Sequence, residues 1–159
     1  MNKTALILLG GLLVLLPAKV VRAQEKPGEL GIGVYMGIPF GFSAKYLLDR
    51  RIAVDTALGV QGGDFDVHMD LLTHFRDLSR QPPVGKLAPY VGLGMKIRDE
   101  EDTLFGFRFV GGLAYLIKDT PLEVFAEIAP VLRVAPSADS EFDGGAGLRY
   151  YFGSGSRRK

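Results

Sequence analysis

The sequence predicts an all-β protein, an eight-stranded antiparallel up-and-down transmembrane β-barrel preceded by a cleavable signal peptide. The first observation behind this fold class is that successive segments of about ten residues alternate apolar side chains with small or polar ones. The second is that turn residues separate these segments. The third is that no apolar run after residue 23 has the length of a membrane helix. A chain that crosses a bilayer without helices must close into a barrel, because unpaired backbone groups are too costly in lipid.

Residues 1–23 have the pattern of a secretory signal peptide. Lys3 gives a basic start, Ala5 to Leu16 form an apolar run, and Val21-Arg22-Ala23 places small or medium residues before a cleavage point at Gln24. The apolar run is shorter than the roughly 20 residues that a membrane helix needs. We therefore expect a signal peptide at 1–23, an outer-membrane barrel domain at 24–152 and a flexible basic tail at 153–159.

Charge and cysteine content exclude several classes of protein. The 159 residues include 19 basic and 18 acidic side chains, and removing residues 1–23 leaves 16 basic against 18 acidic. Because nucleic-acid binding needs a basic excess, we expect no nucleic-acid partner. The absence of cysteine excludes disulfides, thiolate metal sites and a lipoprotein anchor.

Eight segments carry the alternation. The clearest is Glu29–Pro39, in which the even-numbered residues from Leu30 to Ile38 are apolar and the odd-numbered ones are glycines and Tyr35. The remaining predicted strands are, in order, Phe42–Leu48, Arg51–Val60, Phe65–Phe75, Leu87–Ile97, Leu104–Ile117, Leu122–Val134 and Asp143–Phe152.

Turn chemistry sets the connections between these strands. Gly62-Gly63-Asp64 favours a tight turn, and the polar stretch Ala135–Phe142 is predicted to be a loop. Pro89 and Pro130 interrupt the pattern, because proline removes a ladder hydrogen bond. We expect both prolines near strand ends, where a β-bulge can accommodate them.

The composition of the two rows predicts which face meets lipid. One row is large and apolar, whereas the other is dominated by glycine and alanine with isolated charges, which is unlike the solvated face of a soluble sheet. We expect the second row to fill the lumen, where four basic and four acidic side chains neutralise one another and join His68 in a structural network. The predicted members are Lys45, Asp55, Asp66, His68, Asp70, Lys96, Arg108, Glu127 and Arg149. A soluble exported barrel, with the apolar row as its core, is the alternative.

Aromatic residues on the apolar row sort by depth if both termini face the periplasm. Phe40, Phe42, Phe65, Phe105 and Phe107 then lie near the outer interface. Tyr46, Phe75, Tyr115, Tyr150 and Phe152 lie near the inner one. Two such girdles are typical of membrane barrels.

Enzymatic chemistry has one candidate location. Asp66, His68 and Asp70 project to the same side of one predicted strand, which would suit an acid–base pair or a metal site. We interpret them as part of the lumen network, since the inward Ser43 has no predicted place beside a histidine. The acidic stretch Asp99–Asp102 could bind a cation, but a solvated loop is the simpler interpretation. We therefore expect no catalytic residues, no bound metal and no cofactor.

Two motifs carry a family resemblance. Ala88-Pro89-Tyr90-Val91-Gly92-Leu93-Gly94 opens a mid-chain strand, and Gly147-Leu148-Arg149-Tyr150-Tyr151-Phe152 closes the last one. With the signal peptide, they make residues 24–152 resemble the small eight-stranded OmpA/OmpX-like outer-membrane barrels of Gram-negative-type bacteria. In that family, residues matching Gly147, Tyr150 and Phe152 form a C-terminal assembly signal. The resemblance departs at Gly145, where a polar residue is usual, and in the seven residues that follow Phe152.

The resemblance implies a bacterial outer-membrane location and two partners: the membrane lipids and the barrel-insertion machinery. We expect a monomer that serves a structural or envelope-integrity function, with a filled lumen and no wide pore. A small-ligand or lipid-binding barrel and a lipid-modifying outer-membrane enzyme are the alternatives.

Overall fold

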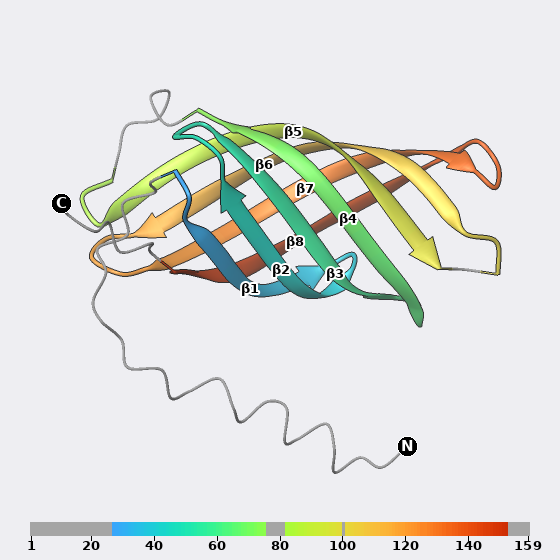
Figure 1. Cartoon of the computed structure of the whole chain (residues 1–159), viewed down its shortest axis with the longest axis horizontal. Coiled ribbons are helices and arrows are strands. Elements are labelled where there is room, and N and C mark those ends of the chain that lie inside the picture. The colour runs from blue at the N-terminus through green and yellow to red at the C-terminus, as the bar shows by residue number, and fades with distance from the viewer. Residues whose placement is uncertain (1–26, 76–81, 100, 153–159) are drawn as a thin grey trace, which may run out of the picture.

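The computed structural model describes residues 27–75, 82–99 and 101–152, which form one closed antiparallel β-barrel (Figure 1). Its strands are β1 Leu30–Gly37, β2 Phe40–Leu47, β3 Ile52–Gln61, β4 Asp64–His74, β5 Gly85–Asp99, β6 Leu104–Ile117, β7 Leu122–Ala135 and β8 Asp139–Phe152. Each strand pairs with the next along the chain, and β8 pairs with β1 to close the barrel. The predicted all-β, eight-stranded up-and-down barrel is therefore confirmed.

Two predicted segments, the signal peptide at 1–23 and the tail at 153–159, lie outside the described residues. In the part of the chain that is described, no helix is long and apolar enough to cross a membrane.

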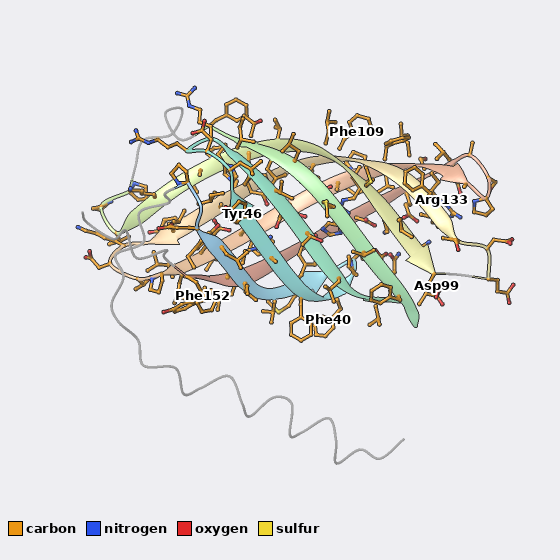
Figure 2. The ribbon with its side chains drawn as sticks, viewed as in Figure 1. Phe40, Tyr46, Asp99, Phe109, Arg133 and Phe152 are labelled. Carbon is orange, nitrogen blue, oxygen red and sulfur yellow. The ribbon has the colours of Figure 1, made fainter. Side chains whose placement is uncertain are left out.

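Apolar side chains cover the outside of the barrel wall and charged side chains lie inside, which is the reverse of a soluble barrel. Large apolar side chains cover the outside: Met36 is 56% exposed, Leu93 62% and Ile128 59%. Figure 2 shows Phe40 and Phe152 projecting from the outside of the wall in the same way. The inside holds the buried charged residues together with an apolar cluster that includes Tyr35, Leu72, Tyr90 and Phe125.

Glycine makes room in the lumen for large side chains from neighbouring strands. A Cβ added at Gly147 would lie 2.5 Å from ring atoms of Phe125, and one added at Gly145 would lie 2.6 Å from Cε1 of Tyr35. The interior of an eight-stranded barrel is just wide enough for side chains to fill. The glycine-rich row is therefore needed to admit the rings and guanidinium groups described below.

The two ends of the barrel differ in the height of the wall. We call the end with the β1–β2, β3–β4, β5–β6 and β7–β8 connections the distal end, and the other the terminal end, because β8 ends there at Phe152. β1 and β2 have eight residues each, whereas β5 has 15 and β6, β7 and β8 have 14 each. In Figure 1 the β7–β8 hairpin extends to the far right, beyond the ends of β1 and β2.

Several strand boundaries differ from the prediction. β2 begins at Phe40 rather than Phe42, and β8 begins at Asp139, so most of the predicted loop Ala135–Phe142 belongs to strands. The polar sequence of this stretch suggested a loop, but pairing with β7 down to Arg133↔Asp139 extends the ladder. Tertiary pairing has overridden local composition here.

The expectation that bulges near strand ends accommodate the two prolines was wrong. Pro89 and Pro130 lie inside β5 and β7, and the β6–β7 register shift falls instead between Phe105 and Gly106. The Pro89 carbonyl accepts from the Phe75 N–H at 2.7 Å, just past the end of β4, so the missing donor falls where that ladder stops. Pro130 pairs with Phe142 of β8.

Candidate functional site in the barrel lumen

Charged side chains fill the lumen in three connected groups. The group nearest the terminal end is the Arg149 cluster, formed by Ser43, Lys45, Asp55, Glu123, Arg149 and Tyr151. Arg149 Nη2 lies 2.7 Å from both Asp55 carboxylate oxygens, and Nη1 lies 2.9 Å from Glu123 Oε1. A guanidinium group suits this arrangement because its planar fork donates to several oxygens at once.

The remaining groups of the Arg149 cluster complete its hydrogen bonding. Arg149 Nε donates to Ser43 Oγ at 2.8 Å, and Lys45 Nζ lies 2.9 Å from Glu123 Oε2. Tyr151 donates to the same Glu123 oxygen at 3.0 Å. Arg149 Cζ also lies 3.6 Å from the centre of the Phe125 ring, a cation–π contact. Two bases and two acids thus form a neutral unit.

The middle group is the Arg108 cluster, formed by Tyr35, Asp70, Tyr90, Arg108 and Glu127. Arg108 Nε lies 3.2 Å from Asp70 Oδ1, and Nη2 lies 3.4 Å from Glu127 Oε1. Tyr35 and Tyr90 donate to the two Glu127 oxygens at 3.1 and 2.8 Å. Glu127 is therefore held by strands β1, β5 and β6 at once.

The group nearest the distal end is the Lys96 cluster, formed by Gln61, Asp66, Lys96, Arg98, Glu141 and Asp143. Lys96 Nζ lies 2.8 Å from Asp143 Oδ1, 3.1 Å from Asp66 Oδ2 and 3.1 Å from Glu141 Oε1. Asp143 also accepts from Arg108 Nη1 at 2.6 Å, which joins this cluster to the middle one. The three clusters therefore run along the lumen from one end to the other.

The predicted catalytic candidate lies at the edge of the Arg108 cluster. His68 Nε2 is 3.8 Å from Asp70 Oδ2, and ligand atoms of His68, Asp70 and Glu127 lie within 4.8 Å of one another, a spacing from which a metal site could form. However, Arg108 already donates to both carboxylates, so a cation there would meet a fixed positive charge. Ser43 belongs to the Arg149 cluster, and in the strand ladder Ala57 separates it from His68.

All nine side chains predicted for the lumen lie there, each 5% exposed or less: Lys45, Asp55, Asp66, His68, Asp70, Lys96, Arg108, Glu127 and Arg149. Sequence reasoning missed Glu123 and Asp143, which accept from arginine on the same row. Continuing the period-two count from Glu127 back to Glu123, and from Gly145 to Asp143, would have found them.

The expected balance of four bases and four acids does not hold. Among the described residues, the buried acids are Glu29, Asp55, Asp66, Asp70, Glu123, Glu127 and Asp143. The buried bases are Lys45, Lys96, Arg98, Arg108 and Arg149. Seven acids therefore face five bases. Glu29, Glu123 and Asp143 lie within predicted strands but were left out of the count, and Arg98 is added because β5 extends beyond Ile97.

The residues of the predicted assembly signal lie at the end of β8. Gly147 faces the lumen against Phe125, whereas Tyr150 and Phe152 face outward with ring centres 4.9 Å apart. Their role in assembly stays a prediction.

Comparison with known proteins bears on the fold. No protein-family model matches the chain, and no curated protein matches its sequence. A solved structure, the N-terminal β-barrel domain of Pseudomonas aeruginosa OprF, matches with a TM-score of 0.61 and 17% sequence identity. The match covers 80% of this chain and 100% of the OprF chain. At this identity the likeness shows a shared barrel fold, and the family assignment stays a prediction.

Proposed function

We propose that the protein is an integral outer-membrane β-barrel of structural or envelope-integrity type, with a filled lumen and no wide pore. The observation that carries the proposal is the inverted distribution of side chains. Large apolar groups such as Leu93 and Ile128 are more than half exposed, while Arg108 and Arg149 are buried to within 1%. An apolar exterior of this extent is unfavourable in water and suits contact with lipid tails. The likeness to the OprF barrel supports the barrel fold on which the proposal rests.

The lumen contacts support a barrel without a wide channel. Arg149, Arg108 and Lys96 each hold carboxylates contributed by other strands, so ion pairs cross the interior at three successive levels. Eight strands leave an interior that side chains can fill. The lumen therefore offers stability rather than a path for solutes.

A non-enzymatic role is part of the proposal. Asp70 beside His68 is engaged in an ion pair with Arg108, and the Ser43 hydroxyl accepts from Arg149 Nε in another cluster. Nucleophilic catalysis would need a hydroxyl within hydrogen-bond reach of the histidine. The partners that we propose are outer-membrane lipids and, through Gly147, Tyr150 and Phe152, the barrel-insertion machinery.

Electrophoretic mobility in SDS tests the proposal directly. Protein extracted from the membrane fraction is run with and without boiling, since a closed membrane barrel resists SDS until heated. We expect two mobilities, and no stepwise conductance when the folded form is added to a planar bilayer. A single mobility together with recovery in the soluble periplasmic fraction would contradict membrane insertion. Large steady conductance would contradict the filled lumen.

A further inference from the structure

The wall of the barrel has a step between β8 and β1 at the distal end. The β1–β8 ladder stops at Gly37↔Gly145, and one further hydrogen bond joins the Ile38 N–H to the Gly144 carbonyl at 3.0 Å. Beyond it, Asp139–Asp143 pair with β7 alone. One edge of this part of β8 therefore has no neighbouring strand within the described residues, and with about 3.3 Å per residue it is roughly 16 Å long.

The direction of the backbone groups on this edge follows from two hydrogen bonds. The Gly144 carbonyl points toward β1, whereas the Tyr151 N–H donates to Pro121 on the β7 side at 2.8 Å. Because backbone groups alternate sides along an antiparallel ladder, Phe142 and Ser140 point the same way as Gly144. Ser140 N–H donates to its neighbour Asp139 Oδ1 at 2.7 Å. The Phe142 N–H and the carbonyls of Ser140 and Phe142 thus face the empty side of the step.

Acidic residues outnumber basic ones at the distal end, which contains the step. The described residues in ranges 61–66, 96–106 and 131–143, which make up the distal part of β3–β8, include eight carboxylates and three bases. The carboxylates are Asp64, Asp66, Asp99, Glu101, Asp102, Asp139, Glu141 and Asp143; the bases are Lys96, Arg98 and Arg133. Asp64, Glu101 and Asp102 also line a cavity of about 370 Å³ with Pro136. A strand that entered the step would meet a negative field.

We infer that the free edge of β8 at Ser140–Phe142 binds an extended cationic peptide, which adds to the barrel wall as a short antiparallel or parallel strand. Addition of a strand satisfies the edge N–H and carbonyl groups, and the surrounding carboxylates select lysine or arginine side chains. Phe142, 62% exposed, supplies an apolar contact on the outer side of the added strand.

A second copy of this chain does not fit the edge. Two barrels in one membrane are related by a rotation about the membrane normal, which keeps both β8 strands running in the same vertical direction. Strands in such barrels are tilted by about 35–45°, so the facing edges would cross at a steep angle instead of pairing. The acidic surroundings would also repel one another. The inference goes beyond the proposed function, and peptide binding by folded protein in detergent does not depend on membrane insertion.

The substitution F142P tests how much the Phe142 backbone N–H contributes to peptide binding. F142P removes the edge N–H while leaving the β7 ladder intact, because the Phe142 backbone points away from β7. F142A is the matched control, since it loses the same ring but keeps the N–H. The probe is a fluorescein-labelled alternating Lys-Val hexapeptide amide, and binding to refolded protein is measured by fluorescence anisotropy at low salt.

We expect the peptide to bind F142A and to bind F142P at least tenfold more weakly, with both variants retaining the heat-dependent SDS mobility shift of the parent. If F142P does not fold, a peptide N-methylated at alternate residues supplies the same test with the unmodified protein, and we expect at least a tenfold loss. Equal binding of the N-methylated and plain peptides would overturn strand addition. Equal binding of an alternating Glu-Val peptide would overturn the selection for a cationic partner.

Discussion

The Arg149 and Lys96 clusters lie at opposite ends of the same lumen and differ in how completely their buried charges are paired. In the Arg149 cluster, two bases meet two acids, and Arg149, Asp55 and Glu123 are at most 1% exposed. In the Lys96 cluster, two bases meet three acids, the Glu141 side chain is 19% exposed, and Asp66 Oδ1 has no hydrogen-bond partner among the described residues. At the terminal end each buried acid is matched by a base. At the distal end the acids outnumber the bases, and of these acids only Glu141 is partly exposed.

This difference between the clusters indicates which end of the barrel contributes more to stability and which end tolerates substitution of charged residues. A guanidinium that donates to Ser43, Asp55 and Glu123 links β2, β3, β7 and β8 and fixes their register. The compact lysine ammonium attracts several carboxylates without a planar geometry. We therefore expect the terminal-end cluster to contribute more to stability, and the distal end to tolerate changes in charge.

Removal of Arg149 should have the largest effect. R149M leaves Asp55 and Glu123 buried, with Asp55 lacking its cation, so the free energy of unfolding should fall by about 3–5 kcal/mol. Urea unfolding in phosphatidylcholine vesicles, followed by far-ultraviolet circular dichroism, measures this loss. The matched control is R50M at the exposed connection between β2 and β3, where we expect less than about 0.5 kcal/mol. Equal losses in the two variants would remove the distinction between lumen and surface arginine.

Disruption of the Arg108 cluster should have the next largest effect. R108A and E127A should each destabilise the barrel by about 3 kcal/mol, because each leaves a buried partner uncompensated. The loss in R108A should not exceed this value, because two of the three carboxylates that contact Arg108 retain other partners. Asp143 still pairs with Lys96, and Glu127 still accepts from two tyrosines. Unfolding midpoints that match the parent in both variants would rule out a structural role for this cluster.

Neutralisation of Asp66 should have the smallest effect. D66N removes one of three acids around Lys96 and should change the free energy of unfolding by less than about 1 kcal/mol, in either direction. The equivalent change D55N removes a carboxylate that accepts two bonds from Arg149 and should cost more. The comparison between the two clusters fails if D66N is as destabilising as D55N in the same urea titration.

The sequence by itself determined the strand number, the order of the strands and the face to which each side chain points. This follows because side chains in a strand alternate with a period of exactly two, so the rows on β1 or β3 can be counted without a structure. It also placed Lys45, Arg108 and Arg149 inside. It failed at Asp139–Phe142, because whether a polar stretch pairs depends on the neighbouring strand rather than on its own residues.

Only the tertiary structure decided which charges meet. Arg149 lies 94 residues from Asp55 and 26 from Glu123, and these three are brought together by barrel closure and the stagger of the strands. The same closure produced the step above Gly37, since the lengths of β1 and β8 matter only once the two strands are adjacent. Periodicity is a local property of the chain, whereas pairing across the lumen and at the seam depends on the register of all eight strands.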